Sequence, residues 1–329
     1  MKNVGLDIGT NLLVAGMLED GNLIFKKERD AFYKITPKTE VNKNSIEFSL
    51  NKRESNYIMD GDNFIVVGED ALEIAIERNS IASRPMKCGV ISPKEKNSLP
   101  ILKLLIETLI GKGEEGSTCF FSVPAVPVDA SFDILYHTEM MKLYIGQMGY
   151  NAYPINEAYC IGLSELVEDG LTGISLSFGA GMVNCAVLHE GESLLDMSIA
   201  RSGDFIDQSV ANALDISPSL VQLEKEAGVD LYKPSTKIME AVSVYYSSVI
   251  LYAIQNIVYE LNKNKNTLPI FNEPAPIIVG GGLSLAKGFV DKFNECLNNV
   301  KFPINVGQAR LSKDPYTCVA NGCFLAAQM

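Results

Sequence analysis

The sequence predicts an α/β protein that contains two duplicated halves. Short apolar strands alternate with amphipathic helices of about 10 to 20 residues, which is the pattern of α/β domains. Two glycine turns, at Gly9 and at Gly179, each follow an apolar strand and lead into another, at equivalent places in the two halves. The chain has 329 residues, which agrees with two domains of about 150 residues each.

The first half begins with a predicted meander of short strands. Residues 4–8 and 13–17 flank the first glycine turn, and residues 22–26 extend the meander. Helical spacing of leucine and isoleucine over 102–109 predicts a helix, and residues 118–123 predict a buried strand. A second helix is predicted from a four-residue repeat that we assign to the core: Tyr136, Met140, Tyr144 and Met148.

The second half repeats this order of elements. Residues 174–178 and 183–189 predict two strands around the second glycine turn. An amphipathic helix is predicted near 242–257, followed by a short buried strand at 277–279 and a helix over about 286–297. Between the elements of the first half, residues 34–63 are polar and lack a period, which favours a small mobile subdomain or a long insertion.

Composition and charge restrict the classes of function. With 28 Lys and Arg against 40 Asp and Glu, the net charge is −12, which argues against a broad nucleic-acid surface but permits one local phosphate site. Seven cysteines without a CxxC pair, and only two histidines, favour buried free thiols in a reducing compartment. The sequence lacks a signal peptide and an apolar run of about 18 residues, so we expect a cytoplasmic protein with no transmembrane segment.

The two glycine turns are candidate phosphate sites. Successive backbone N–H groups in such a turn form a concave nest for an anion, and glycine lets the phosphate approach the backbone. Two turns that face each other across a cleft would hold a polyphosphate from both sides. For either turn alone, an ordinary tight hairpin is the better interpretation, because short glycine motifs have a high false-positive rate.

Three further features extend this hypothesis. Gly280, Gly281 and Gly282 follow a buried strand and remove side-chain bulk where a nucleoside would lie, although a flexible connection is the simpler interpretation. Asp7 ends a strand beside the first turn and is suited to hold Mg²⁺ through water. Glu157 precedes an apolar helical stretch. It would orient an attacking water there, or it is simply an acidic residue in the first turn of a helix, which the helix dipole favours.

In their order, these motifs resemble the phosphate-1, connect-1, phosphate-2, adenosine and connect-2 segments of the actin, sugar-kinase and heat-shock chaperone ATPases. Within that superfamily the chain is most similar to bacterial actins of the MreB and MamK type. The likeness to MreB rests on residues 68–71, 84–91, 202–207 and 314–322, and matching motifs extend from residue 4 to about 326.

The resemblance implies two actin-like (ribonuclease-H-like) domains around a nucleotide cleft that binds ATP or ADP with Mg²⁺. It implies domain I at 1–155 plus 307–329, with a small subdomain inserted at about 30–90, and domain II at 156–306. Glu157 matches the glutamate that positions the hydrolytic water, and Asp7, the second implied catalytic residue, belongs to phosphate-1. Glu226 matches the ribose-contacting acid, with Lys225 as a neighbour. The remaining residues implied to bind nucleotide are Gly9, Thr10, Asn11, Gly179, Ala180, Gly181, Gly280, Gly281, Gly282 and Leu283.

Two positions depart from the family pattern. Ser177 stands where phosphate-2 usually has aspartate, and Met182 stands where it usually has threonine. The missing carboxylate would help to organise Mg²⁺ and water, and electrostatic groups of this kind contribute several kcal/mol to catalysis. We therefore expect slow ATP hydrolysis, with nucleotide binding less affected.

The resemblance implies a cytoskeletal protein that polymerises into filaments with copies of itself, because head-to-tail contacts that do not close a ring produce filaments. Two alternatives remain: a small-molecule kinase on the same fold, and a nucleotide-dependent switch or scaffold that forms no filament. An adaptor or cargo protein is a further possible partner. Only three residues precede Val4, so no N-terminal amphipathic membrane helix is expected, and the acidity argues against direct binding of DNA or anionic lipid.

Overall fold

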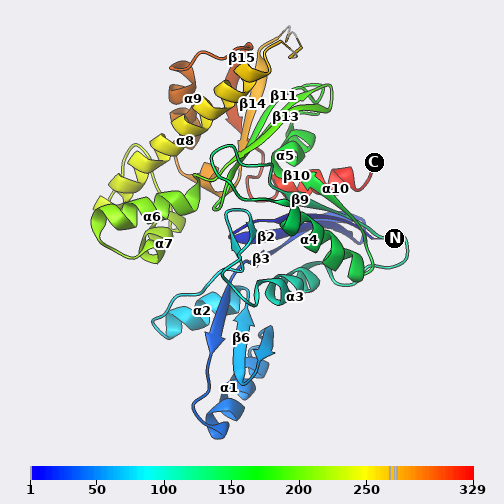
Figure 1. Ribbon diagram of the computed structural model, residues 1–329, viewed down its shortest axis with the longest axis vertical. Coiled ribbons are helices and arrows are strands. Elements are labelled where there is room, and N and C mark those ends of the chain that lie inside the picture. The colour runs from blue at the N-terminus through cyan, green and yellow to red at the C-terminus, as the bar shows by residue number, and fades with distance from the viewer. Residues whose placement is uncertain (1, 267, 270, 272) are drawn as a thin grey trace.

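The computed structural model describes residues 2–266, 268–269, 271 and 273–329. Among these residues, two five-stranded sheets form the body of the molecule, and a small three-stranded sheet projects from one end (Figure 1). The two large sheets belong to the two halves that the sequence predicts.

The first sheet has the strand order β10-β9-β1-β2-β3. β1, β2 and β3 form the predicted antiparallel meander, and β9 and β10 continue the sheet in parallel on the other side of β1. β10 was not predicted, since its residues are largely exposed and contain Pro154, which suits an edge strand. The bounds are β1 (Asn3–Ile8), β2 (Leu12–Glu19), β3 (Asn22–Arg29), β9 (Thr118–Val123) and β10 (Asn151–Asn156).

The second sheet repeats this topology strand by strand, in the order β13-β12-β11-β14-β15. β11, β12 and β13 form the antiparallel meander, and β14 and β15 continue in parallel. The predicted duplication is therefore confirmed. The bounds are β11 (Gly173–Phe178), β12 (Val183–His189), β13 (Glu192–Ile199), β14 (Ala275–Gly280) and β15 (Val306–Leu311).

Two short helices join the halves. α5 (Glu157–Glu165) follows β10 of the first sheet and packs on the second, whereas α10 (Cys318–Ala326) follows β15 of the second sheet and packs on the first. The two helices also pack on each other, so closely that a Cβ at Gly322 would overlap the backbone of Cys160. The chain thus returns to the first half at its C-terminal end, and the division at residue 307 stays a prediction.

Further helices pack outside the two sheets (Figure 1). α3 (Ser98–Ile110) and α4 (Leu135–Gln147) pack on the first sheet, as predicted. The core stripe predicted for α4 is confirmed in part: Met148 is buried and Met140 and Tyr144 pack against the core, but Tyr136 is exposed. The helix also buries three residues outside that stripe, His137, Met141 and Ile145. In the second half, α8 (Lys237–Lys263) and α9 (Phe289–Asn298) contact strands of the sheet, and α6 (Gly203–Leu214) and α7 (Pro218–Glu226) pack on α8.

Helix α8 is the one helix in the described part of the chain that is long and apolar enough to cross a membrane. Its inner face, including Val242, Val249 and Ile257, is buried in the core of the second half, where it packs against α6, α9 and β13. A core helix of a soluble domain meets the same criterion, so the absence of a transmembrane segment stays a prediction.

The polar segment 34–63 lies in a small ordered subdomain with its own core. Helix α1 was not predicted, because it buries only Ile46 and Leu50. The side chain of Thr39 caps this helix by accepting a hydrogen bond from the backbone N–H of Asn42. The subdomain comprises β4 (Phe32–Ile35), α1 (Glu40–Lys52), β5 (Tyr57–Asp60), β6 (Asn63–Val67) and α2 (Glu69–Glu77), and the hairpin β7 (Met86–Lys87) and β8 (Val90–Ile91) leads back to the first half.

Candidate functional site

A cleft of about 450 Å³ lies between the two halves and is lined by residues of both. Gly280 is the one residue of the predicted site that does not line it; it is the buried last residue of strand β14. The cleft brings together the other predicted residues: Asp7, Gly9, Thr10, Asn11, Glu157, Gly179, Ala180, Gly181, Lys225, Glu226, Gly281, Gly282 and Leu283. Their roles in binding and catalysis stay predictions.

The two glycine turns face each other across this cleft. The first turn joins β1 to β2, and the second joins β11 to β12. A Cβ at Gly181 would overlap the side chain of Thr10 and would lie 2.7 Å from the backbone nitrogen of Gly89. Thr10 Oγ1 in turn accepts a hydrogen bond of 3.0 Å from that nitrogen. Glycine at 181 is therefore required for the close approach of the two halves.

Asp7 lines the cleft near the end of β1. Its Oδ1 accepts a hydrogen bond of 2.7 Å from Ser122 Oγ, which comes from the neighbouring strand β9. Burial raises the pKa of Asp7 to about 6, while the hydrogen bond from Ser122 acts in the opposite direction. A divalent cation at this carboxylate would favour its ionised form.

Glu157 is held at both of its carboxylate oxygens. Ser177 Oγ donates to Oε1 at 2.5 Å, and Asn184 Nδ2 donates to Oε2 at 2.8 Å. Burial, and to a smaller extent the negative charge of Asp7, raise the pKa of Glu157 to about 8. A carboxyl group whose pKa lies near neutral pH is suited to exchange a proton with a bound water.

Sequence reasoning missed two of these partners, Ser122 and Asn184. Asn184 is buried within the apolar strand β12, where its Oδ1 also accepts a hydrogen bond of 3.1 Å from the backbone N–H of Ala125 in the other half. A polar side chain inside an apolar strand requires a hydrogen-bond partner. The position of Asn184 in such a strand was the only signal in the sequence that pointed to this residue.

The glycines at 280–282 have different roles. Gly281 has a φ of +82°, and a Cβ there would lie 2.6 Å from the carbonyl oxygen of Phe178. At Gly280 a Cβ would lie 2.9 Å from the Sγ of Cys318, so both glycines serve protein packing. Gly282, which begins a short 3₁₀ helix (Gly282–Leu285), has open space where a Cβ would lie. Only Gly282 therefore fits the idea of a glycine that makes room for a ligand.

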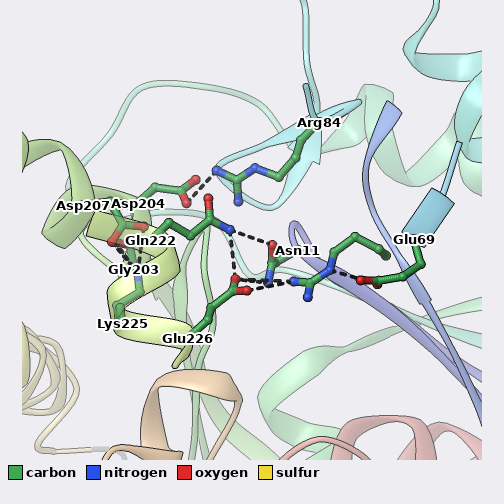
Figure 2. A network of polar contacts seen from close by, with 10 residues as sticks. Asn11, Glu69, Arg84, Gly203, Asp204, Asp207, Gln222, Lys225 and Glu226 are labelled. Atoms are coloured by element: carbon green, nitrogen blue, oxygen red, sulfur yellow. Dashed lines mark hydrogen bonds and ion pairs between the residues drawn. The ribbon is translucent and has the colours of Figure 1, made fainter. Parts of the chain in front are cut away.

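Lys225 is engaged within the protein. Its Nζ donates to both carboxylate oxygens of Asp207 at 2.7 Å and to the carbonyl oxygen of Gly203 at 3.2 Å (Figure 2). Since an ammonium group has three hydrogens, these contacts use all of them. The arrangement supports a role for Lys225 in holding α7 against α6, while its side chain still lines the cleft.

The carboxylates of the cleft do not form a protein-only metal site. In the described part of the chain, no group of three His, Cys, Asp or Glu side chains is placed to hold a metal ion. A Mg²⁺ ion characteristically keeps several waters and takes one or two carboxylates together with substrate phosphates. The carboxylate of Asp7, which lines the cleft beside the first glycine turn, would fit such a ligand set.

Comparison with known proteins identifies the family. A sequence model described as Volactin matches residues 1–327. The chain belongs to the Volactin family. No curated protein sequence matches it significantly.

Solved structures show which fold this Volactin-family chain shares. It is similar to the "MamK double helical filament", with a TM-score of 0.68 and 15% identity over 100% of this chain and 99% of the other. The crystal structure of MreB5 of Spiroplasma citri bound to ADP gives a TM-score of 0.66 and 17% identity over 98% and 94%. The ethanolamine utilization protein EutJ from Carboxydothermus hydrogenoformans gives 0.55 and 15% over 99% and 90%. The predicted two-domain actin-like fold is thereby confirmed.

Proposed function

We propose that this Volactin-family protein binds Mg-ATP in the cleft, hydrolyses it slowly and polymerises into filaments. The observation that carries the nucleotide proposal is the pair of facing glycine turns with the carboxylates of Asp7 and Glu157 between them. MreB5, which has the same fold, is described as bound to ADP, and a MamK variant as bound to AMPPNP. Both descriptions support nucleotide as the ligand here.

In the proposed site, backbone N–H groups of the turns at 9–11 and 179–181 bind the phosphates from opposite sides. Asp7 holds Mg²⁺ through water, and the ion supplies positive charge to the phosphate oxygens. Glu157, fixed by Ser177 and Asn184, orients the attacking water. Phosphoryl transfer of this kind depends on positioning and electrostatics rather than on covalent chemistry.

Slow hydrolysis follows from Ser177. Its hydroxyl donates to Glu157 and supplies no negative charge to Mg²⁺ or water. A phosphate-release assay tests this: we expect low turnover in the wild type and an increase in Ser177→Asp. Turnover equal to that of a strong actin-like ATPase, and unchanged in Ser177→Asp, would contradict it.

Filament formation rests on the similarity to a protein whose structure is described as a double helical filament. Sedimentation and electron microscopy with and without Mg-ATP test it directly, and nucleotide-dependent pelleting with visible filaments is the expected result. ATP binding without pelleting would favour the switch or scaffold instead. Phosphorylation of a sugar in a substrate panel would favour the kinase.

We also propose a cytoplasmic location and the domain division given above. All seven cysteines are free in the structure, which supports a reducing compartment. The repeated sheet topology and the crossing of α5 and α10 support two domains that meet at the cleft. Limited proteolysis with and without nucleotide would test the division.

A further inference from the structure

A network of polar contacts spans the mouth of the cleft at Glu226, on helix α7 (Figure 2). From the first half, Asn11 Nδ2 donates to Glu226 Oε1 at 3.1 Å, and Arg29 Nη1 contacts Oε1 and Oε2 at 3.3 and 3.4 Å. From α7 itself, Gln222 Nε2 donates to Oε1 at 2.9 Å. Glu226 is therefore shared between the two halves.

The two oxygens of Glu226 are used unequally. Oε1 receives three donors, whereas among the described residues Oε2 contacts only Arg29. A carboxylate offers about four lone-pair sites, so Oε2 keeps capacity for further hydrogen bonds. The contacts at Oε1 fix the rotation of the carboxylate and leave Oε2 available at the cleft.

Arg29 is itself held in place. It ends strand β3, its side chain is 20% exposed, and its Nε lies 3.5 Å from Glu69 Oε2 at the start of α2. The carboxylate of Glu28 binds the backbone N–H groups of both Arg29 and Glu69, so this junction with the small subdomain has defined geometry. A guanidinium fixed in this way orients a carboxylate better than a flexible ammonium would.

We propose that Arg29 is a positioning residue for nucleoside recognition: it holds Glu226 across the cleft so that Oε2 accepts hydrogen bonds from the ribose hydroxyls. The inference rests on the proposed nucleotide site and adds a specificity determinant from the opposite half. Arg29 then favours ribonucleotides over 2′-deoxyribonucleotides without touching the phosphates. It also makes ribose recognition depend on a closed cleft, because Arg29 and Glu226 belong to different halves.

The test is titration calorimetry on the full chain with Mg-ADP, Mg-2′-deoxy-ADP and pyrophosphate. We expect Arg29→Gln to weaken ADP binding about tenfold, as for loss of a charged hydrogen-bond partner, and to reduce the ratio of ADP to 2′-deoxy-ADP affinity. Pyrophosphate binding should change by less than about twofold. Arg29→Lys should retain part of the wild-type preference for ADP over 2′-deoxy-ADP. In a protein that already carries Glu226→Gln, adding Arg29→Gln should change ADP affinity little further.

Arg53→Gln is the matched control, since Arg53 pairs with Glu77 at 2.7 Å on the surface of the small subdomain, away from the cleft. It should leave all three affinities unchanged, and thermal melting should show every variant to be folded. Equal weakening of ADP and pyrophosphate, or an unchanged ADP to 2′-deoxy-ADP ratio, would overturn the role of Arg29 while leaving the nucleotide site intact. Failure of the wild type to bind ADP would overturn the proposed function and this role with it.

Discussion

Replacing Glu157 with glutamine should stabilise the protein at alkaline pH. Burial raises the pKa of this carboxyl from its ordinary 4.5 to about 8. Between these values the folded protein retains a proton that the unfolded chain has lost, so the free energy of unfolding falls as pH rises through this window. Glutamine has the same shape, can still exchange hydrogen bonds with Ser177 and Asn184, and does not ionise.

The expected magnitude follows from the same two values. A tenfold change in proton affinity corresponds to about 1.4 kcal/mol, so the full separation corresponds to on the order of 5 kcal/mol. The two proteins should be similar in stability near pH 4.5, and Glu157→Gln should become progressively more stable until about pH 8. Asp7 remains in both proteins, and because its charge acts on Glu157, the difference reports on this pair of carboxyl groups.

Urea unfolding followed by circular dichroism over a series of pH values measures this difference, since the chain has no tryptophan for fluorescence. Glu115→Gln, at an exposed loop position, is the control and should change stability little at any pH. A stability difference between Glu157→Gln and wild type that stays constant from pH 5 to pH 8 would refute the view that desolvation raises the pKa of this carboxyl.

Three further predictions concern single contacts. Asn184→Ala should lower the free energy of unfolding, measured in urea, by about 1 to 3 kcal/mol, because it leaves buried polar groups without a hydrogen bond. It should also lower the rate of phosphate release, because Glu157 loses a partner that fixes its carboxylate. An unchanged rate of phosphate release would contradict this. Gly281→Ala should lower the thermal midpoint, because its Cβ would overlap the backbone of β11 at positive φ; an unchanged midpoint would argue against it. Lys225→Met should lower the free energy of unfolding by about 3 to 5 kcal/mol, because Asp207 stays buried without its ion-pair partner. The double variant Lys225→Met with Asp207→Leu should regain stability, and a double variant that regains none would point to another cause.

The elements with a strong local signal were predictable from the sequence. The strands around the turns at Gly9 and Gly179 are apolar runs broken by glycine, and the repeat of this pattern along the chain indicates the duplication that the two sheets display. Helix α1 was not predictable, because it buries only two side chains. The buried face of α4 was predicted only in part, because this helix has apolar residues on more than one face. His137 is buried and Tyr136 is exposed because of how α4 packs on its neighbours, and residue spacing alone does not reveal this.

The glycine turns of the candidate site could be predicted from the sequence. The side chains that contact residues far away in the sequence could not. The turn residues came from local glycine patterns. Ser122, Asn184 and Arg29 were missed, because each is a single polar residue whose partner is far along the chain or in the other half. Lys225 was assigned to nucleotide from its place in a motif, whereas the structure shows its ammonium bound to Asp207 and Gly203.

In the proposed complex, the two glycine turns hold the phosphates of one nucleotide between the halves. A crystal structure of the protein with Mg²⁺ and a non-hydrolysable ATP analogue tests it most directly. We predict phosphates between the backbone at 9–11 and 179–181, Mg²⁺ near Asp7 with water between them, and the ribose at Glu226. An empty cleft at saturating analogue, or phosphates bound elsewhere, would contradict the account.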